Sequence, residues 1–417
     1  MVLAVTTIGT IFYSIIVFLL VIITLVGLLL FARDKLTPKG DVELQINDRK
    51  ITVSPGSNLL FTLSSNNVFL PSACGGGGTC GMCKCQVIEG GGSILPTETG
   101  FFTRKEQLNH WRLGCQVKVR EPMKIKIPES ILGIKKWECE VVSNRNVSTF
   151  IKEFVVKLPE GEVLEFEPGG YIQIDVPHYE VKFSDFDIQE QFRTDWDYYK
   201  MWDLGIRNKT ETFRAYSMAN YPAEKNLIKL NIRIATPPWD NAKNKFMNVP
   251  PGICSSYIFS RKPGDKVMIS GPYGEFHIKN TDSEMIYIGG GAGMAPLRSH
   301  IFHLFKTLKT TRKVSYWYGA RSLREVFYED EFRAIEKEFP NFTFNLALSE
   351  PLPQDNWSGY KGFIHQVLYD NYLSKLDEPE DVEYYFCGPP MMNNAVVEML
   401  DNLGIPAENI SFDDFGI

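Results

Sequence analysis

Four cysteines constrain the fold of this chain more than any other feature. Cys74, Cys80 and Cys83 lie in one glycine-rich loop, and Cys115 follows much later in the sequence. Glycines let a backbone fold closely around an inorganic core. Thiolates this close together are typical of a four-thiolate iron–sulfur site. The sequence therefore predicts a [2Fe–2S] cluster with these four ligands, in a protein that moves electrons singly.

Zinc is the alternative metal for a four-cysteine site. Structural zinc usually takes two Cys-x(2–4)-Cys pairs or Cys/His mixtures, whereas here three ligands share one loop and the fourth stands alone. That asymmetry favours the plant-type [2Fe–2S] arrangement. Cys74 and Cys80 have five residues between them instead of the usual four. The additional residue alters the path of the loop without removing a ligand.

The N-terminal segment predicts a membrane anchor at residues 1–33, followed by a linker at residues 34–40. No residue from Met1 to Ala32 carries a charged side chain, and about 20 apolar residues span a hydrocarbon core as a helix. A cleaved signal peptide is the alternative, but the segment has no basic start and its apolar run is too long. Its first basic residues come after the apolar run, which predicts cytoplasmic downstream domains.

Overall composition narrows the class of protein further. The 417 residues carry a formal net charge of −6 and no basic tract, which argues against nucleic-acid binding. The eight cysteines are too few and too clustered for a secreted disulfide framework, so we expect a reducing compartment.

Residues 41–128 predict a β-grasp ferredoxin domain of α+β class. Apolar and polar residues alternate on both sides of Asn47-Asp48, which suits a hairpin turn. Ser57 is the expected cap of a short helix, and Thr103 with Glu106 forms a capping box that opens another. We expect two further strands, at Gln86–Ile88 and at Gln116–Val119.

Residues 129–280 predict an antiparallel β-barrel, because short alternating strands and Pro-Gly turns follow one another without long helices. An acidic, aromatic stretch at about residues 179–211 is expected to be an insertion, and one hypothesis makes it a docking surface for a partner subunit. The expected strands are Glu140–Val142, Ile151–Val156, Tyr171–Asp175, Leu227–Ile234 and Lys266–Ser270.

Residues 281–417 predict an α/β, Rossmann-like domain, because strands alternate with helical segments. The glycine run after Met285–Ile288 leads into the helical stretch Leu297–Leu308. Further strands are expected at Lys313–Tyr318, Phe342–Ala347 and Tyr384–Cys387.

A cluster that carries one electron cannot accept a hydride, so a two-electron donor requires a flavin between them. Arg214-Ala-Tyr216-Ser217 offers a guanidinium for a pyrophosphate, an aromatic ring for isoalloxazine and a hydroxyl. A second phosphate grip is expected at a helix start, and Gly274 lies behind it. The residues of that second grip are Gly252, Cys254, Ser255 and Ser256.

These motifs resemble those of the ferredoxin–NADP⁺ reductase superfamily, which binds FAD through Arg-x-Tyr-Ser. Gly291-Ala-Gly293-Met-Ala-Pro296 is similar to its nicotinamide signature, and Tyr384-Tyr-Phe-Cys387-Gly388 to its late strand. The resemblance implies that Ser217 lies by flavin N5 and Cys387 near the nicotinamide, both as catalytic residues. A tight strand–helix turn would also explain the glycines alone.

Nicotinamide selectivity is expected to depend on Glu350. Enzymes of this superfamily that use NADP carry Ser-Arg where this chain has Ser349-Glu350. A carboxylate repels a 2′-phosphate and accepts a hydrogen bond from a 2′-hydroxyl, so NADH is the expected substrate.

The whole arrangement resembles the F subunits of bacterial Na⁺-translocating NADH:quinone oxidoreductases, on motifs that include Trp317-Tyr-Gly-Ala-Arg321 and Asp413-Asp-Phe415-Gly. The resemblance implies hydride transfer from NADH to FAD, then single electrons to [2Fe–2S], integral membrane subunits and quinone, at the bacterial inner membrane. Phe415 is a candidate flavin cover or a core aromatic. An oxygenase reductase, or an anchored electron carrier without NADH activity, remains the alternative.

Overall fold

The computed structural model describes residues 2–36 and 40–413. The chain divides into two compact units. The first contains Met1–Leu70 and Cys83–Leu132, and the second contains Pro71–Met82 and Gly133–Ile417.

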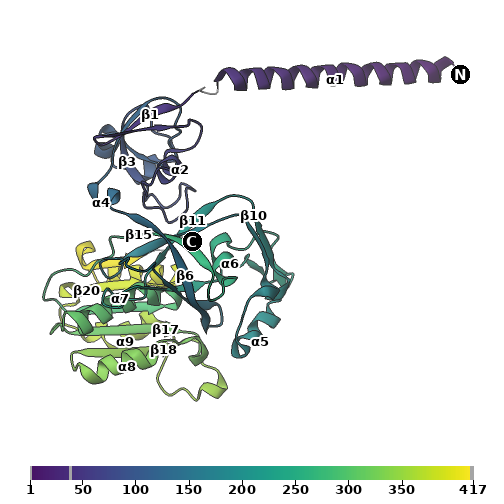
Figure 1. Cartoon of the computed structure of the whole chain (residues 1–417). Helices are drawn as coiled ribbons and strands as arrows, with labels where there is room; N and C mark the ends of the chain where they lie inside the picture. Colours follow the sequence, from purple (N-terminus) through teal and green to yellow (C-terminus); the bar gives the residue numbers. More distant parts are fainter. Residues whose placement is uncertain (1, 37–39, 414–417) are drawn as a thin grey trace. The chain divides into compact units, whose positions relative to one another are not determined.

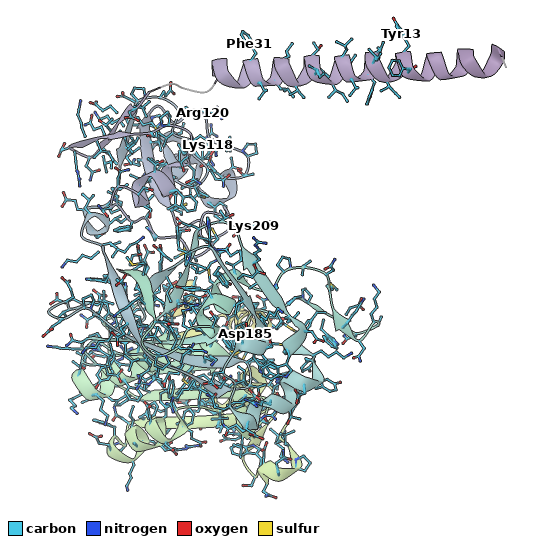
Figure 2. The ribbon with its side chains drawn as sticks, turned by 45° about the vertical axis from the view of Figure 1, so that its right-hand side comes forward. Tyr13, Phe31, Lys118, Arg120, Asp185 and Lys209 are labelled. Carbon is cyan, nitrogen blue, oxygen red and sulfur yellow. The ribbon has the colours of Figure 1, made fainter. Side chains whose placement is uncertain are left out.

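The first element is one long apolar helix, α1 (Val2–Leu36). Its segment Phe12–Ala32 has 21 residues and a mean hydropathy of 3.3, and none of it is buried inside the protein. At about 1.5 Å per residue it matches a hydrocarbon core of about 30 Å. Tyr13 and Phe31 project outward from it (Figure 2). The predicted helix is confirmed, but it continues into the expected linker, where residues 37–39 lie outside the described part.

The rest of the first unit is a five-stranded sheet with short helices against it. Its strand order is β2-β1-β5-β3-β4, with β1 and β5 parallel and the other neighbours antiparallel. The predicted turn at Asn47-Asp48 is confirmed, because Ile46 pairs with Arg49. The strands are β1 (Val42–Ile46), β2 (Arg49–Val53), β3 (Lys84–Glu89), β4 (Trp111–Leu113) and β5 (Met123–Lys126).

Short helices α2 (Leu59–Ser64) and α3 (Arg104–Leu108) accompany this sheet, followed by α4 (Glu129–Leu132). The capping box of Thr103 and Glu106 at α3 is confirmed. The cap of α2 is Asn58 rather than Ser57, because its side chain accepts from the Phe61 amide.

The strand expected at Gln116–Val119 is wrong. In this segment only Lys118 forms a β-bridge, with Asn58. The carbonyls of Val117 and Val119 accept from Leu59 and Gly56 at 2.8 Å each. The segment therefore pairs with the chain around the start of α2 instead of joining the sheet.

The second unit contains a six-stranded antiparallel barrel in the order β11-β8-β15-β6-β7-β12. The outer strands of this order meet through a bridge between Met218 and Leu230, and Ala219 N donates to Lys229 O at 2.7 Å. The predicted barrel is thus confirmed. Its strands are β6 (Lys135–Ser148), β7 (Ile151–Lys157), β8 (Tyr171–Val176), β11 (Thr212–Ser217), β12 (Leu227–Arg233) and β15 (Lys266–Tyr273).

The aromatic insertion turns most of its large rings inward. Phe183, Phe192 and Trp196 are buried in the barrel core, whereas Tyr198 stays exposed. Packing therefore accounts for most of its aromatic content, and little apolar surface remains for the hypothetical docking role. The insertion contains the paired strands β9 (Tyr179–Lys182) and β10 (Gly205–Asn208) and the helix α5 (Glu190–Tyr198).

The last part of the chain forms the predicted parallel sheet, in the order β19-β18-β17-β16-β20-β21. Its strands β17, β18 and β20 are labelled in Figure 1. The strands are β16 (Met285–Gly290), β17 (Val314–Ala320), β18 (Phe342–Leu348), β19 (Tyr360–Lys361), β20 (Glu383–Cys387) and β21 (Ile410–Asp413). Apolar residues of α7 (Met294–Phe302) and α8 (Glu329–Glu338) join one core. Those of α9 (Ile364–Asn371) and α10 (Pro390–Asn402) join another, so both faces are covered.

Strand order in this sheet reverses between β16 and β20. In open parallel sheets, ligands bind beyond the carboxyl ends of the strands at such a switch point. The chain segments that leave β16 and β20 there are Gly291–Gly293 and Gly388–Pro390.

Candidate functional site

Two of the predicted cluster ligands contact each other, and the segments that carry the other two are hydrogen-bonded together. Cys80 Sγ lies 3.3 Å from Cys74 Sγ within the loop at residues 71–82. Cys83 is buried just before β3, and the amide of Gly114, the residue before Cys115, donates to the Cys83 carbonyl at 2.7 Å. Among the described residues, no group of three or more metal-ligating side chains is already assembled. The four-cysteine ligand set therefore stays a prediction.

The donor chemistry of this loop fits a cluster. Gly75, Gly76 and Gly78 have positive φ, a conformation that glycine adopts without strain and that lets the backbone curl. The hydrogen bond between the two thiols lowers the pKa of Cys74 and raises that of Cys80, so it only moves the proton within the pair, and the fit rests on the closeness of the sulfurs and the shape of the loop.

A buried ion pair that the sequence did not reveal supports the segment before Cys115. Glu98 is fully buried, and Arg112 Nη2 donates to its Oε2 at 2.7 Å. The same carboxylate accepts from the amides of Leu113 at 2.8 Å and Leu95 at 3.0 Å. These contacts fix β4, which leads directly to Cys115.

The predicted flavin motif lies on β11. Arg214 and Tyr216 alternate with buried Phe213 and pair with β8. Arg214 Nη1 donates to Thr212 Oγ1 at 3.0 Å and to the Phe213 carbonyl at 2.8 Å. Among the described residues this half-buried guanidinium has no ion pair, so it fits an anionic pyrophosphate.

The second predicted grip lies at the start of α6 (Ile253–Phe259). A Cβ on Gly252 would lie 2.6 Å from Ala235 Cβ, which explains the glycine. Ser255 Oγ accepts from the Ala235 amide at 3.1 Å, so that hydroxyl holds the turn. Burial raises the pKa of Cys254 to about 12, which keeps its thiol neutral. Ser256 is fully buried beside it.

The end of β15 approaches β8 closely at Gly274. Its φ is +122° and a Cβ there would lie 3.2 Å from Gly170 Cα. A larger residue would push these two backbones apart, so Gly274 is required by packing beside the flavin motif.

A cradle without side chains lies at the switch point of the parallel sheet. A Cβ on Gly293 would come within 2.0 Å of the Cys387 carbonyl oxygen and 2.6 Å of the Gly388 nitrogen. Gly291 has φ +55°. Cys387 and Pro296 are buried around this contact. Gly291, at the edge of this tightly packed backbone, is half-buried, and it lies at the carboxyl ends of two parallel strands, where open sheets bind dinucleotides.

Arg321 and Glu350 lie next to each other at the adjacent strand ends. The Glu350 amide donates to the Arg321 carbonyl at 2.8 Å, and both residues are exposed. Their side chains are free to meet the ribose of a nucleotide bound along this edge, as the selectivity argument requires.

Asp413 is a site residue for which no role was predicted. Ser217 Oγ donates to Asp413 Oδ2 at 2.7 Å, although 196 positions separate the two residues. Asp413 pairs in register with Cys387 on β20. The structure thereby brings the end of the flavin strand beside the predicted nicotinamide residue. Phe415, the proposed flavin cover, lies outside the described residues.

Three family descriptions match consecutive parts of the chain. Residues 42–120 match the 2Fe-2S iron-sulfur cluster binding domain. Residues 198–278 match the oxidoreductase FAD-binding domain, and residues 287–398 match the oxidoreductase NAD-binding domain. The chain therefore combines domains of the three cofactor classes predicted from its motifs.

Solved structures share this fold. A cytochrome P450 reductase from Amycolatopsis has a TM-score of 0.62 at 21% identity, covering 90% of this chain and 98% of its own. The ferredoxin reductase in carbazole 1,9a-dioxygenase has a TM-score of 0.58 at 25% identity, with the same coverage. The first of these likenesses shows the fold alone.

Curated relatives match the chain along nearly its whole length. The F subunit of the Na(+)-translocating NADH-quinone reductase of Klebsiella pneumoniae is 56% identical over 406 residues, 97% of this chain and 98% of that protein. Its counterpart in Pseudomonas aeruginosa is 54% identical over 407 residues, with the same coverage. The counterpart in Methylococcus capsulatus is 56% identical over 400 residues, 96% of this chain and 97% of its own. The chain therefore belongs to the family of Na⁺-translocating NADH-quinone reductase F subunits.

Proposed function

We propose that electrons from NADH enter a Na⁺-translocating NADH:quinone reductase through this chain. The Ser217–Asp413 hydrogen bond carries the proposal, because it joins the strand with the flavin motif to the strand beside Cys387. Identity of 54–56% to F subunits over 96–97% of the chain supports it.

Different residues of the candidate site bind and orient FAD and NADH. Arg214 holds the pyrophosphate of FAD, Tyr216 packs against its ring system, and Ser217 lies at its reactive edge. The cradle at Gly291–Gly293 and Gly388 holds NADH. When bound, FAD and [2Fe–2S] supply the chemistry that divides the two electrons of a hydride into one-electron transfers.

Selectivity for NADH is assigned to Glu350. Its exposed carboxylate beside Arg321 repels a 2′-phosphate and accepts a hydrogen bond from a 2′-hydroxyl. Anaerobic flavin bleaching by NADH and by NADPH tests this assignment. We expect NADH to have the far higher kcat/KM, and similar values for the two would refute it.

The four cysteines are the proposed cluster ligands. Replacing Cys74, Cys80, Cys83 or Cys115 by serine should abolish the visible and EPR signals of the cluster, while flavin bleaching by NADH survives. Cys85→Ser is the matched control, because Cys85 is buried on β3 nearby and lies outside the proposed set. Retention of the cluster signals in a ligand variant would count against the set.

The helix α1 is proposed to anchor the chain as a single span in the bacterial inner membrane, with the domains in the cytoplasm. The expected partners are integral membrane subunits that pass electrons to quinone. A membrane pull-down of the tagged full chain should recover such subunits and NADH-dependent quinone reduction. Recovery of an oxygenase instead would favour the oxygenase-reductase alternative.

A further inference from the structure

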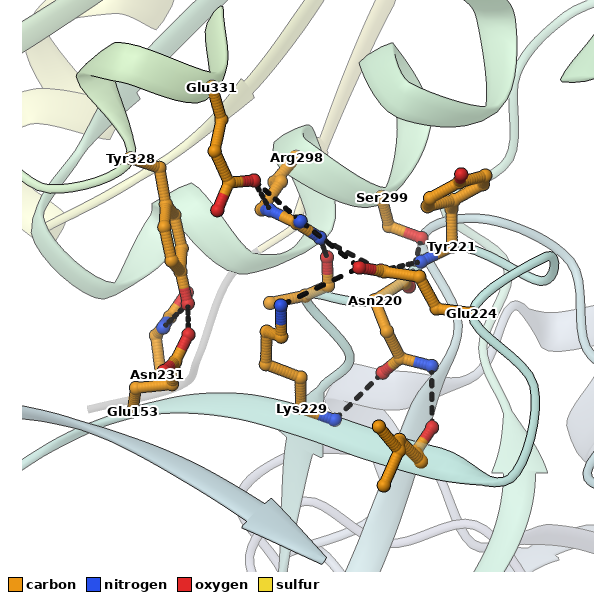
Figure 3. A network of polar contacts seen from close by, with 12 residues as sticks. Glu153, Asn220, Tyr221, Glu224, Lys229, Asn231, Arg298, Ser299, Tyr328 and Glu331 are labelled. Atoms are coloured by element: carbon orange, nitrogen blue, oxygen red, sulfur yellow. Dashed lines mark hydrogen bonds and ion pairs between the residues drawn. The ribbon is translucent and has the colours of Figure 1, made fainter. Parts of the chain in front are cut away.

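Three consecutive residues of α7 bind the backbone of the barrel. Arg298, Ser299 and His300 are each at most 2% exposed. Arg298 Nη1 donates to the Ala219 carbonyl at 2.7 Å, and Ser299 Oγ donates to the Asn220 carbonyl at 2.8 Å (Figure 3). Both acceptors lie in the connection that follows β11.

His300 makes the third attachment, to two other parts of the barrel. Its Nε2 lies 3.1 Å from the Pro168 carbonyl and 2.9 Å from the Phe276 carbonyl. Carbonyl oxygens only accept, so Nε2 carries the proton and donates. The ring also stacks on Phe276 with centroids 4.8 Å apart. The second half of α7 is thus attached to the barrel before β8, after β11 and after β15.

The Arg298 guanidinium is shared between two carboxylates. It donates to Glu224 at 3.0 and 3.2 Å and to Glu331 of α8 at 2.6 and 3.0 Å (Figure 3). Its Cζ lies 4.1 Å from the centroid of the Phe302 ring. Burial would lower the pKa of Arg298, but the two carboxylates raise it overall. The group therefore stays charged.

A guanidinium buried as deeply as that of Arg298 is tolerated only when its N–H groups are hydrogen-bonded and its carboxylate partners are in place. A guanidinium is a rigid planar fork, so such contacts admit one geometry where a flexible ammonium would admit several. The Glu224 carboxylate is also 3.5 Å from Lys229 Nζ on β12. The network therefore fixes one arrangement of α7, α8 and the connection between β11 and β12.

The sequence positions of this network link it to both candidate sites. Arg298 lies two residues after Pro296, which ends the proposed NADH loop. Ala219 lies two residues after Ser217, which ends the flavin motif. The attachment therefore lies two residues along the backbone from the proposed NADH loop and two residues from the flavin motif, and these two groups must face each other.

We propose that Arg298, Ser299 and His300 are positioning residues that hold the NADH loop at a fixed place relative to the flavin strand. They set the rate of hydride transfer rather than the affinity for NADH. The inference rests on the proposed function, since it assumes that NADH reduces the flavin.

The test uses the full chain with FAD and compares Arg298→Met, Arg298→Lys and Ser299→Ala with the wild type. Arg333→Met is the matched control, because Arg333 on α8 pairs with Glu329 and Glu336 of the same helix and donates to the Phe344 carbonyl on β18, all outside the barrel. Stopped-flow bleaching of flavin over a range of NADH concentrations separates the limiting rate from the apparent Kd. Hydrogen exchange of the peptide at residues 218–226, measured without NADH, reports the attachment itself.

We expect the limiting rate to fall about 100-fold in Arg298→Met, since a misplacement of about 1 Å costs about 100-fold. The apparent Kd should change less than about threefold, and exchange at residues 218–226 should accelerate about tenfold or more. Arg298→Lys and Ser299→Ala should give smaller losses in the same direction, and Arg333→Met none.

A limiting rate within about twofold of wild type in Arg298→Met overturns the proposal, as does a raised Kd at an unchanged rate. If that variant fails to fold, Arg298→Lys and Ser299→Ala decide, and wild-type rates in both overturn it. If NADH does not bleach the wild-type flavin, the proposed function fails. Hydrogen exchange then still decides whether Arg298 attaches α7 to the barrel.

Discussion

Substitution of Gly293 by alanine should damage the NADH cradle specifically. The backbone there is helical, with φ −61° and ψ −10°, so alanine suits the dihedral angles. The added Cβ would nevertheless lie 2.0 Å from the Cys387 carbonyl oxygen, where contacts under 3.0 Å essentially never occur. The loop and the end of β20 must therefore separate by about 1 Å, and a misplacement of that size costs about 100-fold in rate.

Gly293→Ala should lower both the rate of hydride transfer and the free energy of unfolding. A 100-fold loss corresponds to about 2.7 kcal/mol of transition-state stabilisation at about 1.36 kcal/mol per factor of ten. Overpacking of the contact should also lower the free energy of unfolding by about 1–3 kcal/mol. The assay is anaerobic flavin bleaching by NADH, with dithionite reduction to show that flavin and cluster remain intact.

Gly100→Ala is the control, because a Cβ at Gly100 meets nothing within 4 Å. That variant should retain the wild-type kcat/KM for NADH. If Gly293→Ala binds FAD fully and its kcat/KM stays within about threefold of wild type, the cradle is not where NADH binds and the reasoning is refuted.

Three further predictions follow from buried or exposed charges. Glu98→Ala leaves Arg112 buried without its partner, which should cost about 3–5 kcal/mol; cluster absorbance should be lost at a lower temperature, and an unchanged melting temperature would contradict this. Glu350→Ser should raise kcat/KM for NADPH at least about tenfold, and no change would remove Glu350 from the selectivity argument. Burial lowers the pKa of His300 from 6.5 to about 4, so the unfolded chain takes up a proton first as pH falls. The free energy of unfolding should therefore drop by up to about 3 kcal/mol between about pH 6.5 and pH 4. In His300→Gln, urea unfolding should show a smaller drop over the same pH range. An equally steep drop in that variant would refute the assignment of this effect to His300.

Local signals in the sequence predicted local structure well. The turn at Asn47-Asp48 and the capping box of Thr103 depend on residues within a few positions of each other. The apolar helix and the fold classes of the barrel and the parallel sheet follow from periodicity and from the succession of strands and helices along the chain. Such features need no knowledge of distant contacts.

Features set by distant partners were missed. The segment at Gln116–Val119 alternates like a strand, but its hydrogen bonds go to the chain around Asn58. Asp413 gains a role only because folding brings it to Ser217. A charged Arg298 directly after the apolar residues Met294–Leu297 was the available signal for the α7 attachment, but nothing in the sequence identified Glu224 as its partner.

The order of reduction in the full-length protein shows whether electrons from NADH enter through the flavin and then reach the cluster. Rapid anaerobic mixing with NADH, followed by absorbance and by freeze-quench EPR, records flavin and cluster separately. We predict that flavin absorbance bleaches first and that the cluster signal follows. A Cys74→Ser variant should bleach its flavin at the wild-type rate without a cluster signal. Cluster reduction before flavin bleaching, or no bleaching by NADH at all, would contradict this prediction.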